Sequence, residues 1–285
     1  MKAQLIDGKR ISAEIKAEAA EEAAALKAKG VTPCLAVVLV GDDSASQVYV
    51  NNKKKACEAV GIRSVSHVLS GGTTEEALLE LIAKLNADQD IHGILVQMPV
   101  PKQIDERKVI LAIDPKKDVD CFHPVNVGNL HTGGEGFLPC TPAGIIELIK
   151  RSGHSIEGKQ CVVIGRSNIV GKPVAMLLMQ ENGTVTICHS RTRNLAEICR
   201  GADIIVSAVG KVNTVTADMV KEGAILIDVG MNRNEAGKLC GDVDFENVKE
   251  IAGAITPVPG GVGPMTIAML MKNCNTAAKI QNGLE

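Results

Sequence analysis

Short apolar runs that alternate with helix-like segments constrain the fold of this chain more than any other feature. The run CLAVVLVG (34–41) is typical of a buried strand, and a helical pattern follows it. Similar runs recur at 63–70, 91–97, 161–165, 184–188, 202–210 and 224–230. Because helical patterns fill the gaps between them, the sequence predicts an α/β fold.

The runs fall into two series, which predict two domains. Helices are expected near 73–85, 104–113 and 141–152, and the Gly-, Pro-, Asn- and His-rich stretch 114–139 is expected to be irregular. Residues 1–30 predict a helix, and 264–280 predict a long final helix that crosses back to the first half. We therefore expect one domain of residues 1–142 plus 269–285 and another of residues 143–268.

The composition excludes several classes of protein. Aromatic residues make up 1% of the chain and the net charge is −2, so neither a base-stacking platform nor a basic field for nucleic acid is expected. Nine cysteines without a CxxC pair indicate a reducing, cytoplasmic compartment, and the six histidines lack metal-ligand spacing. We therefore expect no metal. No apolar run is long enough to span a bilayer, so we expect no membrane partner either.

The helix expected after the first strand carries the only tyrosine of the chain, four residues before a lysine. Asp42, Asp43 or Ser44 could cap this helix. Side chains at positions i and i+4 share one helix face, so Tyr49 and Lys53 are expected to point the same way. A tyrosine that packs and a lysine that stands in water would give the same pattern, so the pair alone leaves both interpretations open.

A glycine turn opens the second series of strands. In CVVIGRSNIVGKPVAMLLM (161–179), Gly165 and Gly171 bracket a turn between a strand and a helix. Backbone N–H groups at such a helix start favour a pyrophosphate. The spacing differs from GxGxxG, since Ser167 stands in the position of the second glycine. The strand–turn–helix context predicts dinucleotide binding, with an ordinary turn as the alternative.

Residues about 20 positions beyond this turn indicate the cofactor. An acid there would hold the ribose 2′-OH of NAD, but TICHSRTRN (186–194) offers Ser190, Arg191 and Arg193 and no acid. Arg166 in the turn adds another cation. Guanidinium groups beside a hydroxyl suit the 2′-phosphate of NADP. The sequence favours NADP over NAD, and solvated surface arginines are the alternative.

Taken in order, the motifs resemble those of the bifunctional methylenetetrahydrofolate dehydrogenase/methenyltetrahydrofolate cyclohydrolase family of one-carbon metabolism. The resemblance covers almost the whole chain and rests on YVNNKKKACEAVGI, GILVQMPVP, PKKDVDCFHPVNVGNL, PCTPAGIIELI, VVIGRSNIVGKPVA, CHSRT and TPVPGGVGPMT. It implies oxidation of 5,10-methylenetetrahydrofolate with NADP, then hydrolysis of the methenyl product to 10-formyltetrahydrofolate, which serves purine biosynthesis. It further implies a homodimer whose subunit has an N-terminal folate-binding catalytic domain and a Rossmann-type NADP-binding domain.

The resemblance also implies roles for individual residues. Lys53 is the implied catalytic lysine, Tyr49 lines the folate site, Gln97 contacts the lysine and Asp120 binds the pterin. The implied NADP-binding residues are Gly165, Arg166, Ser167, Ser190, Arg191 and the backbone near Met231. The loop TPVPGGVGPMT (256–266) is implied to bring Pro259, Gly260 and Gly261 to the substrate. Taken alone, this loop is equally typical of a tight interdomain turn.

One position departs from the family pattern. The family usually reads DVDG, whereas this chain reads DVDC, with Cys121 in place of the glycine. If the position needs positive φ, a cysteine there costs roughly 1 kcal/mol or more. A nucleophilic role is not expected of Cys121, because neither half-reaction needs a covalent intermediate.

Two other functions remain open from sequence. A shikimate-type dehydrogenase for a small hydroxy acid would keep the NADP half without the YxxxK helix, and a non-catalytic NADP sensor would leave Lys53 without a role. The residue chemistry fits the folate enzyme. Hydride transfer mainly needs two rings to be positioned, whereas ring hydrolysis needs a proton carrier, which a lysine can provide. Gln97 does not titrate, so it can orient Lys53 without a permanent ion pair.

Overall fold

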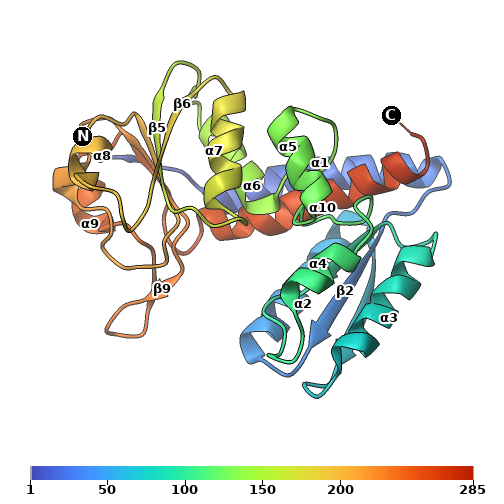
Figure 1. Ribbon diagram of the computed structural model, residues 1–285. Helices are drawn as coiled ribbons and strands as arrows, with labels where there is room; N and C mark the ends of the chain where they lie inside the picture. The colour runs from blue at the N-terminus through green and yellow to red at the C-terminus, as the bar shows by residue number, and fades with distance from the viewer. Residues whose placement is uncertain (1, 285) are drawn as a thin grey trace. The chain divides into compact units, whose positions relative to one another are not determined.

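Two parallel sheets organise the chain, as the alternating segments predict (Figure 1). The computed structural model describes residues 2–284, apart from the side chains of Ser44 and Ala45. It divides into two units: unit 1 comprises Met1–Ala13 and Thr141–Thr266, and unit 2 comprises Glu14–Cys140 and Ile267–Glu285. Our domain bounds, which assign whole functional domains, remain a prediction.

The sheet of unit 2 has the strand order β3-β2-β4, with both pairs parallel. Its central strand β2 (Cys34–Val40) is buried along its whole length, since neighbouring strands and helices cover it. Aliphatic side chains and a cysteine form the core on this sheet, as the scarcity of aromatic residues predicts. The other elements are β3 (Arg63–Leu69), β4 (Gly93–Val96), α2 (Ser44–Val60), α3 (Glu75–Ala87) and α4 (Glu106–Ala112).

The start of α2 shows why the chain turns into a helix after β2. The Asp43 carboxylate accepts a hydrogen bond from the Ser46 N–H at 2.7 Å, so Asp43 is the N-cap among the three predicted candidates. The helix ends at Gly61, which adopts φ 84°. The cap sets where α2 starts and therefore where Tyr49 and Lys53 lie on it.

The stretch 114–139 differs from the prediction, because it contains the helix α5 (Pro124–Thr132). Pro124 stands in the first turn, where a missing N–H costs nothing, and Gly133 ends the helix at φ 69°. His123 Nδ1 accepts a hydrogen bond from the Val125 N–H at 3.2 Å. The proline and glycine that suggested an irregular stretch are the start and stop signals of a short helix.

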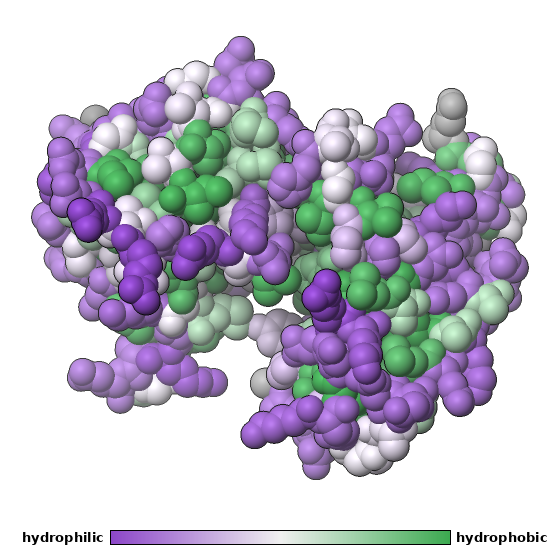
Figure 2. All heavy atoms as spheres, viewed as in Figure 1, coloured by the Kyte–Doolittle hydropathy of each residue, from purple (hydrophilic) through white to green (hydrophobic). Residues whose placement is uncertain are grey.

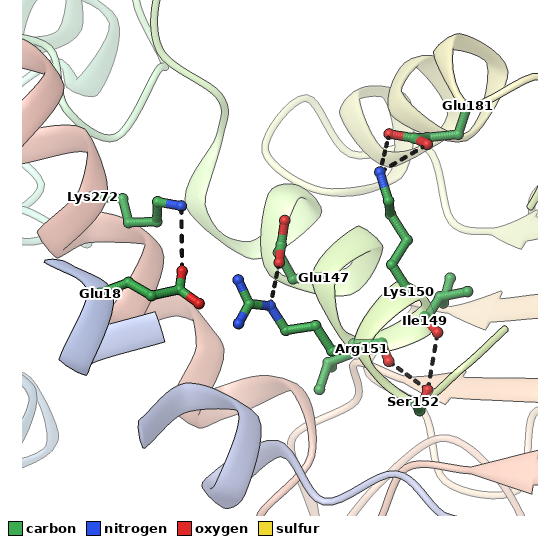
Figure 3. Close-up of polar contacts among 9 residues, drawn as sticks. Glu18, Glu147, Ile149, Lys150, Arg151, Ser152, Glu181 and Lys272 are labelled. Carbon is green, nitrogen blue, oxygen red and sulfur yellow. Dashed lines mark hydrogen bonds and ion pairs between the residues drawn. The ribbon is translucent and has the colours of Figure 1, made fainter. Parts of the chain in front are cut away.

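The two long terminal helices confirm the predicted return of the chain. α1 (Gly8–Ala28) and α10 (Val262–Gln281) each pass from unit 1 into unit 2. Within unit 2, Asn275 Nδ2 of α10 donates to the Ala19 carbonyl of α1 at 2.8 Å. Figure 3 shows Lys272 of α10 reaching Glu18 of α1, at 3.8 Å. The final helix therefore packs against the N-terminal one in the unit of the first strands.

The sheet of unit 1 is Rossmann-like, with six parallel strands in the order β1-β11-β8-β7-β5-β6. Its first strand, β1 (Gln4–Leu5), lies in the segment predicted to be wholly helical; two residues are too few to show a strand pattern. The other strands are β5 (Gln160–Ile164), β6 (Thr184–Cys188), β7 (Ile204–Ser207), β8 (Ile225–Asp228) and β11 (Ala254–Ile255). A hairpin of β9 (Asn232–Arg233) and β10 (Leu239–Cys240) follows β8.

Short helices precede or connect these strands, and an ion pair joins the ends of two of the helices. The connecting elements are α6 (Cys140–Arg151), α7 (Gly171–Gln180), α8 (Leu195–Arg200), η1 (Ala217–Met219) and α9 (Phe245–Val248). Lys150 at the end of α6 contacts Glu181, which follows α7, at 3.1 Å (Figure 3). Such exposed pairs contribute little stability, so apolar burial on the sheet holds these helices.

The strand orders show where each unit offers a binding site. The order reverses at β2 in unit 2 and at β5 in unit 1, because each of these strands lies between the next strand in sequence and a later one. In open parallel sheets, ligands bind beyond the carboxyl ends of the strands at such points. Within residues 2–284, no helix is long and apolar enough to cross a membrane, and hydrophilic side chains dominate the face in Figure 2.

Candidate active site

Lys53 and Gln97 meet at the carboxyl edge of the unit 2 sheet. Lys53 lies on α2, which follows β2, and Gln97 directly follows β4. Lys53 Nζ donates to Gln97 Oε1 at 2.9 Å, and Gln97 Nε2 donates to the Met98 carbonyl at 2.8 Å. The second bond fixes the amide so that its oxygen faces the lysine. The contact implied by the resemblance is present.

Tyr49 lies one turn before Lys53 on the same helix, as the spacing predicts. Its side chain is 40% exposed. A tyrosine of this exposure is not part of the buried core, and its role at a folate site remains a prediction. Its ring is available to a ligand that reaches Lys53.

Asp120 joins this group from a segment beside β4. The segment forms a parallel bridge between Ile94 and Asp118, which brings the following residues to the same sheet edge. Burial raises the pKa of Asp120 to about 6, the Lys53 ammonium opposes this rise and the Asp118 carboxylate adds to it. Asp120 is therefore ionised at neutral pH, in electrostatic contact with Lys53, and it takes up a proton as the pH falls through about 6.

Buried polar side chains that the sequence analysis missed hold the turn before and after Asp120. The buried Asp118 carboxylate accepts hydrogen bonds from the Phe122 and His123 N–H groups, at 3.2 and 2.8 Å, and from Asn126 Nδ2 at 2.8 Å. Lys117 Nζ donates to the carbonyl of Leu85 at 3.0 Å. The turn therefore has little freedom to move.

Asn273 of α10 supports the same turn from within unit 2. Its buried Nδ2 group donates to the Val119 and Leu138 carbonyls, both at 2.8 Å. Val119 directly precedes Asp120, so α10 fixes the backbone from which that carboxylate projects. A signal existed in the sequence: Asn273 interrupts an otherwise apolar helix face, where a buried amide must find partners.

Cys121 adopts the backbone conformation that its place in the motif suggested. Its φ is 60°, a left-handed conformation that disfavours residues with a Cβ. The thiol is buried and Sγ donates to the Phe137 carbonyl at 3.2 Å. Burial, with the carboxylates of Asp118 and Asp120, raises the pKa of Cys121 to about 12. The thiol is neutral at physiological pH, which agrees with the expectation that it is no nucleophile.

In unit 1, the two glycines that bracket the turn between β5 and α7 have no room for a side chain. A Cβ on Gly165, at φ 128°, would lie 2.4 Å from the Ala208 carbonyl oxygen, and a Cβ on Gly171 would lie 2.4 Å from that of Gly165. The turn thus has bare backbone at Gly165 and Gly171, at the point where the strand order reverses. This cradle fits the close approach of a dinucleotide phosphate group.

The start of α7 differs from the expectation in one respect. Ser167 Oγ accepts the N–H groups of Val170 and Gly171, both at 3.2 Å, and the Ser167 carbonyl accepts that of Lys172 at 3.0 Å. The N–H groups of the N-cap residue Val170 and of the first two helical residues therefore have partners within the protein, at the helix start where a pyrophosphate is expected. Ser167 thus holds the turn that leads into α7, whose N-cap is Val170.

The other predicted cofactor residues lie at the same edge of the sheet. The Gly165 N–H donates to the Cys188 carbonyl at 2.9 Å, so the turn with Arg166 adjoins the loop with Ser190 and Arg191. All three side chains are exposed. Met231, which follows β8, is 56% exposed.

The loop with Pro259, Gly260 and Gly261 connects β11 to α10 in unit 1. Gly260 has φ 105°. A Cβ on Gly261 would lie 2.7 Å from the Pro257 carbonyl oxygen, and one on Gly8 would lie 1.8 Å from the Gly261 carbonyl oxygen. Packing within unit 1 is therefore enough to require glycine at position 261, with or without a ligand.

A Rossmann-type sheet with a bare glycine turn, accompanied by a second unit that joins a lysine, an amide and a carboxylate, defines a two-unit nucleotide-dependent enzyme. The family model described as the catalytic domain of tetrahydrofolate dehydrogenase/cyclohydrolase matches residues 6–120. The model of its NAD(P)-binding domain matches residues 139–282.

Individual proteins agree with these matches. The "Bifunctional protein FolD" of Acetivibrio thermocellus is 60% identical over 281 residues, which are 99% of each chain. The crystal structure of the bifunctional FolD dehydrogenase/cyclohydrolase of Campylobacter jejuni is 52% identical, with a TM-score of 0.95 over 98% of this chain and 99% of that one. The Trypanosoma brucei enzyme, complexed with NADP cofactor and an inhibitor, is 42% identical, with a TM-score of 0.92 over 98% of both chains.

The chain therefore belongs to the tetrahydrofolate dehydrogenase/cyclohydrolase family, and the resemblance found in the sequence is confirmed. A shikimate dehydrogenase of Aquifex aeolicus is 15% identical, with a TM-score of 0.51 over 88% of this chain and 93% of that one, and shares the fold alone.

Cys121 provides a stability test of the turn. Cys121→Gly and Cys121→Ala both remove the thiol, but alanine still carries a Cβ at φ 60°. We expect the glycine variant to be the more stable of the two by about 1 kcal/mol in urea unfolding.

The control is Ala77→Gly on the exposed side of α3, where glycine should instead lower the unfolding free energy by about 1 kcal/mol. An alanine variant at 121 as stable as the glycine variant would show that the left-handed conformation is not required.

Proposed function

We propose that this chain oxidises 5,10-methylenetetrahydrofolate with NADP and then hydrolyses the 5,10-methenyl product to 10-formyltetrahydrofolate. Membership of the dehydrogenase/cyclohydrolase family supports both steps. The NADP complex of the Trypanosoma brucei relative supports the cofactor. The observation that carries the proposal is the hydrogen bond of Lys53 to Gln97 beside Asp120, since it joins a proton carrier to a carboxylate suited to the pterin.

Each residue of this group has a proposed role. The Asp120 carboxylate accepts hydrogen bonds from the amino-pyrimidine edge of the pterin, and its ionisation above pH 6 provides the acceptor. Lys53 moves a proton as the methenyl ring opens. Gln97 orients Lys53 through a neutral acceptor, which adds no charge of its own to hold the proton on the lysine. Tyr49 lines the folate on the same helix face.

The residues of unit 1 would hold NADP, which accepts the hydride when bound. Gly165 and Ser167 shape the turn that the phosphates approach, while Arg166, Ser190 and Arg191 provide positive charge and a hydroxyl for the 2′-phosphate. The backbone at Met231 lies on the opposite side of the strand-order reversal, beyond β8. Pro259, Gly260 and Gly261 are proposed to contribute bare backbone to the folate site.

Arg166 provides the test of cofactor choice. Arg166→Ala should weaken NADP binding by about tenfold to a hundredfold, because a lost charged hydrogen bond is worth roughly 1.5–3 kcal/mol. NAD, which lacks the 2′-phosphate, should lose little affinity in the same fluorescence titration. Arg200→Ala, at the far end of α8, is the control and should change neither. Equal losses for both cofactors would remove Arg166 from the 2′-phosphate site.

Lys53 provides the test of the chemistry. Lys53→Met keeps the length and apolar packing of the side chain while it removes the ammonium. Because a general acid–base group typically contributes 10²–10⁴-fold, cyclohydrolase turnover should nearly disappear, while folate and NADP still bind. Dehydrogenase turnover should fall less, since hydride transfer itself needs no base.

Lys54→Met is the matched control, because Lys54 is exposed and projects from another face of α2. Both rates should be measured on each purified variant, with binding checked by titration. If the Lys53 variant hydrolyses the methenyl substrate within a few-fold of the parent rate, Lys53 is not the proton carrier.

We propose that the chain works as a cytoplasmic homodimer. All nine cysteines are free thiols, which suits a reducing compartment. β6 forms one edge of the unit 1 sheet, and Ile187 on it is 38% exposed, as in strands that a second copy covers. Light scattering at micromolar concentration should give twice the mass of the chain, and Ile187→Lys should reduce it. A monomer mass for the parent chain would contradict the proposal.

A further inference from the structure

A fully buried carboxylate lies beneath the loops at the carboxyl edge of the unit 1 sheet. Asp242 has no exposed surface. Its Oδ2 accepts hydrogen bonds from Ser207 Oγ at 3.1 Å, from the Val209 N–H at 2.8 Å and from the Gly210 N–H at 3.3 Å. Its Oδ1 accepts the Lys211 N–H and Asn232 Nδ2, both at 2.9 Å. One carboxylate thus holds the loop after β7 and the start of the β9–β10 hairpin.

A second buried carboxylate fixes the position of the first. Asp228, at the end of β8, accepts the N–H groups of Gly230, Asp242 and Val243, at 2.9, 2.8 and 2.9 Å. Burial raises the pKa of Asp228 to about 6, although these three N–H donors lower it. A Cβ on Gly230 would lie 2.2 Å from Asp242 Oδ1, and one on Gly241 would lie 1.9 Å from Asp228 Oδ2. The two carboxylates and the surrounding backbone interlock without space for adjustment.

The loops held by Asp242 follow β7 and β8, beside the glycine turn, where the nicotinamide end of a bound dinucleotide is expected. The Ala208 carbonyl oxygen lies against Gly165, so the loop that begins there borders the pyrophosphate turn. The candidate 2′-phosphate residues follow β6, on one side of β5, whereas the loops held by Asp242 follow β7 and β8 on the other side. An extended dinucleotide with its adenosine end at β6 therefore places its nicotinamide end over β7 and β8.

The loops held by Asp242 also carry exposed apolar side chains. Val209, Val212 and Met231 are exposed by 38, 37 and 56%, respectively, and they lie within or beside the loops in question. Apolar side chains with a few fixed polar groups are typical of the lining of a cofactor site. The carboxylate beneath them determines which way the backbone of Val209–Lys211 faces.

We infer that Asp242 is a positioning residue for the nicotinamide end of NADP, because it fixes the Val209–Lys211 loop and Asn232 on the β7–β8 side of the strand-order reversal. This inference rests on the proposed function. A carboxylate suits the task, since it has only acceptor sites and can hold five donors in one rigid arrangement. An amide in its place would turn an N–H₂ group toward backbone N–H donors and force the loop to shift.

The test uses Asp242→Asn and two ligands that share the adenosine end. NADP carries the nicotinamide, whereas adenosine 2′,5′-bisphosphate lacks it. We expect the variant to bind NADP about tenfold to a hundredfold more weakly, in line with several disturbed hydrogen bonds, and to bind the bisphosphate within about twofold of the parent affinity. The dehydrogenase KM for NADP should rise, while hydrolysis of methenyltetrahydrofolate, assayed without nucleotide, should persist.

The control is Asp244→Asn, at a neighbouring carboxylate that accepts a hydrogen bond from Asn247 Nδ2 at 2.6 Å; this variant should change neither affinity. Parallel losses for NADP and the bisphosphate in Asp242→Asn, or no loss for either, would overturn the inference. If that variant does not fold, Ser207→Ala, which removes one donor, should give the same selective loss at about twofold to tenfold. Failure of the proposed function would appear separately, as a parent chain that reduces no NADP.

Discussion

Buried carboxylates that accept loop N–H groups are the interaction on which both candidate sites depend. In unit 2, Asp118 gathers the backbone after it into the turn that presents Asp120. In unit 1, Asp242 and Asp228 gather the loops beyond β7 and β8. A buried carboxylate without partners would cost several kcal/mol. Each of these has donors that would otherwise be unsatisfied, so the loops and the charges stabilise each other.

The carboxylates that hold the loops are different residues from those proposed to act on the substrate. The carboxylates of Asp118, Asp228 and Asp242 each accept three or more hydrogen bonds from the protein. Asp120 and Lys53 instead keep an electrostatic contact that a substrate can alter. Gln97 is fixed on one side by the Met98 carbonyl and accepts a hydrogen bond from Lys53 on the other. The cysteine at position 121 shows how firmly the turn is held, since the backbone keeps φ 60° although the residue is not glycine.

The sequence predicted the features that depend on local patterns. Apolar runs marked the long strands, Asp43 was among the predicted caps, and the spacing of Tyr49 and Lys53 set their shared face. Features that depend on pairing distant segments escaped: β1 exists only because β11 lies beside it, and Asp242 became visible only once the loops around it were folded. A detail of the glycine turn escaped for a similar reason, because no pattern reveals that Ser167 Oγ accepts the N–H groups of Val170 and Gly171.

The central claim is that one chain carries two reactions, of which only the first needs nucleotide. The most direct measurement supplies the purified chain with methenyltetrahydrofolate alone, then with methylenetetrahydrofolate and NADP, and follows the methenyl absorbance and NADPH separately. The account predicts hydrolysis at full rate without nucleotide, and NADPH formation only in the second mixture. Absence of hydrolysis until NADP is added, or oxidation without hydrolysis, would contradict it.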